Sequence, residues 1–279
     1  MSFRIRQTAP EELGLLKQLA ENEGLNPGLN DIASVYQADP AGFFTCLSGD
    51  KPAGFISAIK YGSRYGFIGL FLIYPEFRNT AAAPILFRTA YKYLAKSNAG
   101  MDIPFKFVAR IEYTGAKFAH KIKRYEGYID VDNFFDNRVK VVTKNLLPLV
   151  CSYDKAFFPD NRTNFLMNWL KMKKSFSFAY MRHREVRGYG MIRKCLDGWK
   201  VGPLIADHTY IADEILITLA KRIMGDKLSI DVPLSNHIAV ELAKKYLLKE
   251  VSSTARYYTK YEPDIDPQNI YAVTSVDFG

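Results

Sequence analysis

Cysteine and long apolar runs are scarce in this chain, and each scarcity excludes a class of protein. The three cysteines, Cys46, Cys151 and Cys195, lie far apart and form no C-x-x-C pair, so we expect reduced structural thiols rather than a disulfide or zinc framework. No stretch has 18 consecutive apolar residues, and the N-terminus contains no apolar signal core. The sequence therefore predicts a cytoplasmic protein without a membrane-spanning segment.

Local signatures of several common enzyme classes are also missing. The four histidines, His120, His183, His208 and His237, show neither H-E-x-x-H nor another paired metal spacing, so we expect no metal. There is no G-x-S-x-G, no G-x-x-x-x-G-K-[ST] and no G-x-G-x-x-G after a strand. These absences argue against a metallohydrolase, a serine hydrolase, a P-loop NTPase and a dinucleotide enzyme.

Length and charge leave the number of domains and the type of partner open. A chain of 279 residues with 48% hydrophobic and 24% charged residues is an ordinary globular sequence, long enough for one large domain or for two of about 140 residues. Its net charge of +9 suits an acidic partner. The basic clusters at residues 117–124, 171–174 and 182–184 are scattered between elements, which indicates solvated faces rather than a nucleic-acid surface.

One stretch, residues 66–95, predicts a strand, a tight loop and a helix. Residues 66–74 form a nearly unbroken apolar run of strand length, which Pro75 ends. From Ala82 onward the apolar residues recur at intervals of three and four, the spacing of one helix face. The loop between them places the exposed amides of a helix N-terminus beside a strand end, where an anion such as a pyrophosphate is favoured.

Pro75-Glu76-Phe77-Arg78, followed by small residues and a helix, resembles the acetyl-CoA motif of the GNAT acetyltransferase superfamily. In that family the central strand pairs with the pantetheine arm and the helix amides hold the pyrophosphate. The resemblance implies the following cofactor-binding residues: Leu70, Phe71, Leu72, Ile73, Arg78, Asn79, Thr80, Ala81, Ala82 and Ala83. The alternative is an ordinary strand-to-helix turn.

Ala81 stands where the family has its first glycine. If that position needs a positive φ, alanine there costs roughly 1 kcal/mol or more. If the position is already helical, alanine costs nothing. The sequence leaves both readings of the loop open.

Residues 23–31, which include Glu23, Asn26 and Asp31, resemble a Glu-Gly-x-Asn-Pro-Gly-Leu-x-Asp block of a tandem GNAT subgroup. In GNAT folds this position receives the acceptor, so the resemblance implies that Asn26 and Asp31 bind substrate. The alternative is that these residues only build a turn, since Asn, Pro and Gly are turn formers.

An amine must lose a proton before it attacks a thioester, and the leaving thiolate must regain one. Glu23 is the candidate base, because it adjoins the presumed acceptor loop, and Glu112 is a second candidate. Family members place a tyrosine that acts as the acid a few residues before a Gly-Phe pair in the fourth helix. Here Ile111 stands at the matching position, and Tyr113 is near enough to substitute if the helix begins differently. The alternatives are a surface carboxylate and an ordinary packed tyrosine.

The order of elements repeats along the chain. In the first half we expect a strand at 103–109 and a helix at 115–123; in the second, a hairpin from Gly188 leads to a helix at 211–223. Strands at 227–232, 251–258 and 271–278 and a helix at 236–246 follow. The prediction is a mixed α/β fold of two tandem GNAT-like domains, residues 1–141 and 142–279, each with a mixed central sheet flanked by helices.

The second half has Ala206-Asp207-His208-Thr209 where the first has its Arg78 loop, and Asp207 would repel phosphate. We therefore expect acetyl-CoA in the first half alone, with the second half closing the acceptor cleft. The sequence predicts an N-acetyltransferase acting on a small-molecule or protein amine. The alternatives are a degenerate GNAT scaffold that serves as a binding protein and a Fem-type aminoacyl transferase. The acceptor and the oligomeric state are not readable from the sequence.

Overall fold

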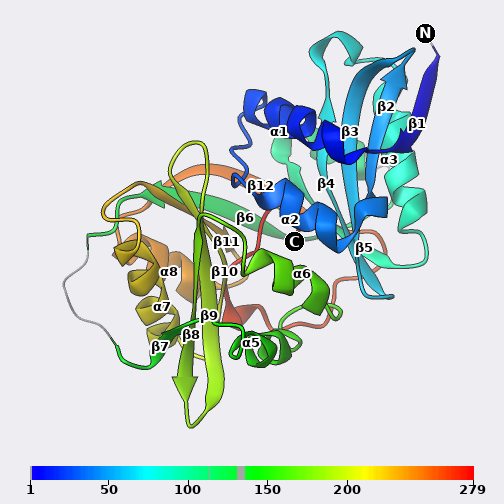
Figure 1. Ribbon diagram of the computed structural model, residues 1–279. Coiled ribbons are helices and arrows are strands. Elements are labelled where there is room, and N and C mark those ends of the chain that lie inside the picture. Colours follow the sequence, from blue (N-terminus) through cyan, green and yellow to red (C-terminus); the bar gives the residue numbers. More distant parts are fainter. Residues whose placement is uncertain (1, 113, 131–135) are drawn as a thin grey trace.

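The computed structural model describes residues 2–112, 114–130 and 136–279, and it shows one large mixed sheet with helices on both faces (Figure 1). The strands are β1 (Phe3–Gln7), β2 (Phe43–Ser48), β3 (Lys51–Tyr61), β4 (Tyr65–Ile73), β5 (Asn98–Pro104), β6 (Lys117–Gly127), β7 (Val139–Val141), β8 (Ser175–Arg182), β9 (Glu185–Lys194), β10 (Trp199–Ala206), β11 (Leu228–Pro233), β12 (Lys249–Tyr258) and β13 (Ile270–Ala272). The α-helices are α1 (Leu13–Asn22), α2 (Asp31–Ala38), α3 (Ala82–Tyr93), α4 (Val108–Glu112), α5 (Leu147–Asp154), α6 (Thr163–Trp169), α7 (Thr209–Lys221) and α8 (His237–Lys245). Single 3₁₀ turns are η1 (Pro10–Glu12), η2 (Pro40–Gly42), η3 (Pro75–Phe77), η4 (Phe105–Phe107) and η5 (Pro267–Asn269).

The predicted repeat of element order is present in the sheet. In the first half β1 to β4 form an antiparallel meander, and β4 then pairs in parallel with β5 across α3. In the second half β7 to β10 form the same meander, and β10 pairs in parallel with β11 across α7. The mixed α/β fold expected from the sequence is confirmed.

The two halves exchange strands at the centre of the sheet. The strand order is β1-β2-β3-β4-β5-β12-β6-β11-β10-β9-β8-β7, so β12 lies between β5 and β6, and β6 lies between β12 and β11. Each half therefore completes the sheet of the other, and hydrogen bonds run without a break across the predicted boundary at 141/142. That boundary stays a prediction, since it divides the sequence more cleanly than it divides the sheet.

The helix predicted at residues 115–123 is wrong, because this segment is the start of β6. Lys117, Lys121 and Lys123 had suggested a basic helix face. In the structure the segment pairs with β12 on one side, and from Ile122 onward also with β11 on the other. Backbone pairing to strands more than 100 residues away overrides the local pattern.

Two other expected strands are also placed differently. The strand predicted at 103–109 is β5, which ends at Pro104, and η4 and α4 follow it. The strand predicted at 271–278 is reduced to β13. It stops because the chain turns at Ser275, whose carbonyl accepts hydrogen bonds from the amides of Phe278 and Gly279.

Helices on one face of the sheet join the halves, and helices on the other face cover them separately. α3 packs on β1 to β4, whereas α7 packs on β8 to β10. On the opposite face α2 packs against α6, and the core there takes residues from both halves, including Phe67, Trp169, Tyr189 and Phe278. This shared core fixes the two halves relative to each other.

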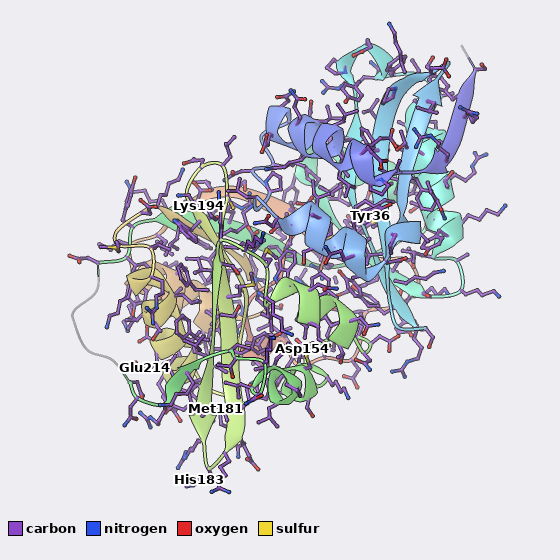
Figure 2. The ribbon with its side chains drawn as sticks, viewed as in Figure 1. Tyr36, Asp154, Met181, His183, Lys194 and Glu214 are labelled. Atoms are coloured by element: carbon purple, nitrogen blue, oxygen red, sulfur yellow. The ribbon has the colours of Figure 1, made fainter. Side chains whose placement is uncertain are left out.

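Several negative expectations can be compared with the described residues. All three cysteines are buried and unbonded, and burial raises the pKa of each thiol, which suits structural roles. No helix in the described ranges is long and apolar enough to cross a membrane. The Arg182–Arg184 cluster sits at the tip of the β8–β9 hairpin, where Figure 2 shows His183 projecting away from the body of the protein.

Candidate functional site

β4 and β5 pair over only the first part of β4 and then separate. Their parallel register runs from Tyr65 opposite Asn98 to Ile68 opposite Met101, while β4 continues to Ile73. β5 turns instead to β12. Within the described ranges no strand pairs with β4 on this side beyond Ile68. The predicted pantetheine segment, Leu70 to Ile73, therefore presents a strand edge with open backbone groups.

Strained backbone marks the point of separation. The register of β4 against β3 shifts between Gly69 and Leu72, and Leu70 has a φ of +44° while only 1% exposed. A leucine in this left-handed region costs of order 1 kcal/mol or more and persists only where its surroundings enforce it. Such outliers cluster at ligand sites. The bulge also turns Phe71 outward, to 43% exposure.

The loop to α3 answers the question raised by Ala81. Ala81 is the N-cap of α3 with φ −69° and ψ −8°, so it is already helical and alanine carries no backbone penalty there. The left-handed residue of the loop is Asn79, with φ +63°, a residue type that tolerates this region. The missing glycine is thus no sign of a distorted loop.

We expect Ala81→Gly to leave the affinity for acetyl-CoA within about threefold of wild type, because glycine gains an advantage only where φ is positive. Isothermal titration of acetyl-CoA into the two proteins measures this. A tenfold gain in affinity would show that the alanine methyl, rather than the backbone, obstructs the loop.

The first turn of α3 offers few free amides. Thr80 Oγ1 accepts from the Ala82 amide at 3.2 Å, Pro84 has no N–H, and the Ile85 amide donates to Ala81 O at 3.2 Å. The Ala83 amide is the one first-turn donor that these contacts leave over. An anion here would depend on Ala83 and on a nearby cation more than on a full set of helix amides.

Arg78 is that cation, and the structure brings it to Glu23, the candidate base. Arg78 Nη2 donates to Glu23 Oε1, and Arg78 Nε contacts Ile73 O at 3.4 Å. Their side chains are 47% and 34% exposed, respectively, so the pair is open to solvent. The sequence predicts Glu23 as the base and Arg78 as a cofactor-binding residue; in the structure they form one ion pair at the end of β4.

Glu112, the second candidate base, has no hydrogen bond or ion pair with Arg78 or Glu23. Glu112, at the end of α4, accepts a hydrogen bond from Tyr257 OH at 3.3 Å. Tyr113, the predicted acid, lies outside the described residues. The roles of both stay predictions.

The predicted acceptor loop is docked onto the second half of the chain. Asn26, in a left-handed conformation, donates through Nδ2 to Asp197 O at 2.8 Å and accepts from the Asp197 amide at 3.2 Å. Gly28 forms an isolated bridge with Cys195. The turn that the sequence predicts around Asn26 is therefore present. The same loop also attaches the segment between α1 and α2 to the β9–β10 turn.

Asp31 is fully engaged inside the protein. Its carboxylate accepts from Arg193 Nε at 2.9 and 3.0 Å and from the Gly28 amide at 2.9 Å, and both charged residues are at most 2% exposed. A predicted contact with substrate would need this pair to open. This geometry favours a role for Asp31 in holding the predicted acceptor loop against Arg193 of the second half.

Sequence analysis missed a cluster of buried charges behind Asp31. Arg124 on β6 holds Asp231 on β11 through two hydrogen bonds of 2.7 and 2.9 Å. Lys200 on β10 donates to Asn26 O at 3.0 Å, and burial, followed by the nearby Arg124, lowers its pKa. Asp277, in the segment after β13, interacts electrostatically with the same groups. The hydrogen bonds of this cluster join residues that lie 107 and 174 positions apart in the chain, so no local pattern signals them.

The second half has a corresponding gap, but it is filled. β10 pairs with β11 only from Trp199 to Val201, and β13 then lies against β10 at Leu204 and Ile205. The amide of Val273, just after β13, donates to Asp231 O of β11 at 3.0 Å. The space that corresponds to the open edge of β4 is therefore occupied by the chain itself.

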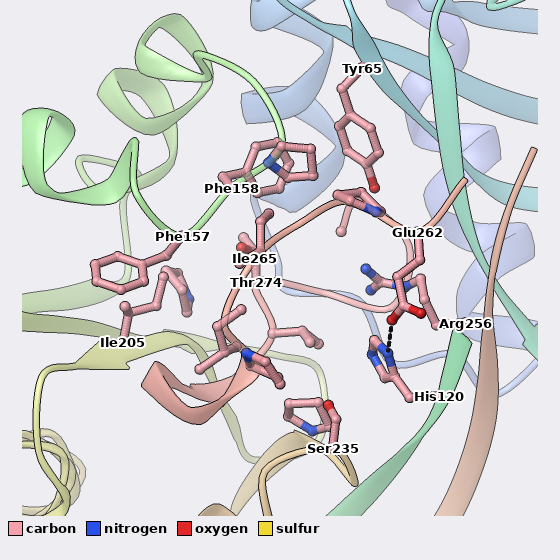
Figure 3. Close-up of a pocket in the computed structure, with 18 of the residues that line it drawn as sticks. Tyr65, His120, Phe157, Phe158, Ile205, Ser235, Arg256, Glu262, Ile265 and Thr274 are labelled. Atoms are coloured by element: carbon pink, nitrogen blue, oxygen red, sulfur yellow. Dashed lines mark ion pairs between the residues drawn. The ribbon is translucent and has the colours of Figure 1, made fainter. Parts of the chain in front are cut away.

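A separate cavity of about 110 Å³ lies between the halves (Figure 3). Figure 3 shows Tyr65 and Phe158 close together on one side of it and Phe157 and Ile205 on the other. His120 Nδ1 lies 3.9 Å from Glu262 Oε1. Burial, and to a lesser extent the charge of Arg256, lowers the pKa of His120 to about 3, so the imidazole is neutral at physiological pH. None of the predicted site residues lines this cavity.

Comparison with known proteins shows similarity to acyltransferases. Residues 150–272 match the acetyltransferase (GNAT) domain family. The chain is 23% identical over 270 residues to a holothin acyltransferase from a Pseudoalteromonas strain, a match that covers 96% of this chain and 92% of that protein. The second half of the chain is thus similar to the GNAT domain family, and the chain over nearly its whole length is similar to an acyltransferase, in agreement with the resemblance of its sequence motifs.

Solved structures show the same fold across the whole length. A putative acetyltransferase from Pyrococcus horikoshii aligns with a TM-score of 0.83 at 19% identity, covering 99% of this chain and 96% of that one. A tandem GNAT protein from the clavulanic acid biosynthesis pathway aligns with a TM-score of 0.64 at 11% identity, covering 94% and 100%. The tandem arrangement is shared, although the family match falls on the half whose gap β13 fills.

Proposed function

We propose that the chain is an N-acetyltransferase that binds acetyl-CoA in its first half and transfers the acetyl group directly to an amine in a ternary complex. The observation that carries the proposal is the open edge of β4, followed at once by Arg78 and the N-terminus of α3. In the second half β13 fills the corresponding gap. The first half thus has an open strand edge for the pantetheine arm next to a candidate anion site, whereas in the second half the corresponding edge is covered.

Within this proposal each part of the donor meets a suitable group. The backbone from Leu70 to Ile73 can pair with the amide groups of the pantetheine arm, as a neighbouring strand would. Arg78 and the Ala83 amide are the donors for the pyrophosphate. Arg78 is half-exposed, so it can turn from Glu23 to a phosphate at small cost. No cluster of metal-binding side chains occurs among the residues described.

The acceptor is proposed to enter beside the loop that carries Glu23, Asn26 and Asp31. The second half closes this side through the contacts of Asn26 with Asp197 and of Asp31 with Arg193. The curated relative is named for holothin, which makes that compound one candidate acceptor to test. Glu23 remains the sequence-predicted base and Tyr113 the predicted acid.

We expect Arg78→Glu to weaken acetyl-CoA binding at least tenfold, because it replaces a charge-assisted donor with a like charge beside Glu23 and the phosphates. Isothermal titration measures the affinity. His208→Glu is the matched control, since it puts a carboxylate at the N-cap of α7, the equivalent helix of the second half. Its affinity should match wild type.

The outcome separates the alternatives. Weakening by His208→Glu instead of Arg78→Glu would move the donor site to the second half and refute the proposal. Absence of CoA binding by wild type would favour a GNAT scaffold that acts as a binding protein. Tight RNA binding with a steep salt dependence would favour an aminoacyl transferase. Turnover is then assayed with acetyl-CoA and a fixed panel of glycinamide, tyramine, spermidine and holothin.

A further inference from the structure

The segment after β13 crosses from the second half to the open edge of β4. Figure 1 shows the C-terminal end of the drawn chain between the halves, beside α2 and α6. Tyr61 OH donates to Phe278 O at 2.7 Å, and Phe278 is 1% exposed and packs on Trp169. The Asp277 amide donates to Ser275 Oγ at 3.2 Å. These contacts hold the turn around Asp277 in one place.

That place is the bulge of β4. A Cβ added to Gly69 would lie 1.9 Å from the backbone oxygen of Asp277, so the two backbones are in direct contact. Gly69 is the residue at which β4 leaves β5 and the one before the strained Leu70. If the pyrophosphate lies at α3 and the pantetheine arm follows β4 backwards from Ile73, the thioester arrives at Gly69 and Leu70. Asp277 adjoins that position.

The carboxyl of Asp277 is uncommitted, unlike its neighbours. Asp31 and Asp231 are each held by an arginine, Arg193 and Arg124, respectively. No hydrogen bond or ion pair reaches the Asp277 carboxyl from any part of the chain that the structure describes. The residue as a whole keeps part of its surface exposed, whereas its carboxyl lies in a buried environment. It is therefore the carboxylate of this cluster that is free to accept a proton.

We propose that Asp277 is the general base that deprotonates the acceptor amine, an inference that rests on the proposed acetyltransferase function. Its carboxylate takes one proton from the ammonium, and the freed lone pair forms the N–C bond to the thioester carbonyl. The C–S bond then breaks, the thiolate receives the second proton from the attacking nitrogen, and Asp277 returns its proton to solvent. No other reactant is needed.

Glu23 is less well placed for this step. Its partner Arg78 contacts Ile73 O, at the far end of the open edge. Four residues of strand separate Ile73 from Gly69, or about 13 Å at 3.3 Å per residue. Glu23 therefore lies beside Arg78 at the phosphate end of the donor, and Asp277 lies at the thioester end.

The charges around Asp277 suit a base that works near neutral pH. Burial raises the pKa of Asp277 to about 6, which Lys200 and Arg124 oppose and the carboxylates of Asp31 and Asp231 reinforce. A group with this pKa is ionised at pH 7 to 8 and still basic enough to hold a proton. Asp277 thus has both a pKa suited to a base and a position beside Gly69.

Asp277→Asn tests the proposal in the full-length protein, with Asp264→Asn, an exposed carboxylate of the same C-terminal segment, as the matched control. With the best amine of the panel, we expect kcat to fall by about 10²- to 10⁴-fold, with acetyl-CoA affinity unchanged by titration calorimetry. Wild type and Asp264→Asn should lose kcat/KM as the pH falls through about 6, and Asp277→Asn should lack this step.

Two readouts do not depend on turnover. The ¹³C resonances of labelled aspartate should include one carboxyl that titrates near pH 6 and is absent from Asp277→Asn. The folded pKa lies above the unfolded value of about 3.9, so stability from this carboxyl is present at low pH and lost as the pH rises through about 6. Asp277→Asn should therefore melt at a higher temperature than wild type at pH 8 and at a similar one at pH 4.

Several results would overturn the assignment. They are a kcat within about threefold of wild type, a persistent acid limb, a weakened affinity for acetyl-CoA that accounts for the lost rate, or a carboxyl midpoint below about 4.5. Any of these in an active wild-type enzyme refutes the role of Asp277 alone. A wild-type protein that binds acetyl-CoA but acetylates none of the amines overturns the proposed function together with it.

Discussion

Asp31→Ala is expected to lower the free energy of unfolding by about 3–5 kcal/mol, because it leaves a buried guanidinium without its counter-ion. Arg193 is 1% exposed, and Asp31 is the one carboxylate that binds it among the described residues. Within the same residues its Nη2 has no hydrogen-bond partner, and its other hydrogen bonds run from Nη1 to the carbonyls of Lys200 and Gly202 at 3.4 and 3.2 Å. Urea denaturation measures the change.

An exposed ion pair provides the control for this experiment. Glu241 binds Lys244 one helical turn away in α8, and their side chains are 70% and 59% exposed. Glu241→Ala should change stability by no more than about 0.5 kcal/mol. If Asp31→Ala costs as little as the control, the acceptor loop does not need this pair to stay docked, and Asp31 becomes available for a direct contact with substrate.

Gly69→Ala is expected to lower stability by about 1–3 kcal/mol and to abolish acetyl transfer, because one added methyl meets the backbone of Asp277. A backbone oxygen fixed by a turn cannot swing aside as a long side chain can. Either the bulge of β4 or the segment around Asp277 must move, and both of them adjoin the proposed site. Thermal unfolding and the amine assay measure the two effects.

Gly14→Ala is the matched control for that substitution. Gly14 lies in α1, and a Cβ there would meet nothing within 4 Å. Alanine should stabilise the helix by up to about 1 kcal/mol and leave turnover unchanged. An active Gly69→Ala protein with wild-type stability would show that the two segments are not held together in solution.

The sequence predicts those parts of this molecule whose signal is local. The apolar run before Pro75 and the three-to-four spacing after Ala82 are enough to place β4 and α3, and the glycine and asparagine near Asn26 mark a turn. The order of motifs also gives the resemblance to the GNAT superfamily, to which the second half of the chain is matched. Each of these depends on residues a few positions apart.

What the sequence does not predict depends on partners far away in the chain. The sequence predicts a helix at 115–123 instead of β6, because the strands that pair with β6 on both sides come from the other half of the chain. The sequence does not predict a role for Asp277, because its neighbour Gly69 lies some 200 residues earlier in the chain. The pairing of Glu23 with Arg78 joins two correct candidates in an arrangement that neither local pattern implies.

The exchange of β6 and β12 has a consequence for the way the protein is made. On a ribosome that releases the chain from its N-terminus, β5 has no neighbour on its outer side until β12 emerges, about 150 residues later. Pairing at such long sequence separation is slow, and an uncovered strand edge recruits other chains. The first sheet of the nascent protein therefore stays incomplete during most of its synthesis. It is completed only when β12 pairs with β5 on one side and with β6 on the other.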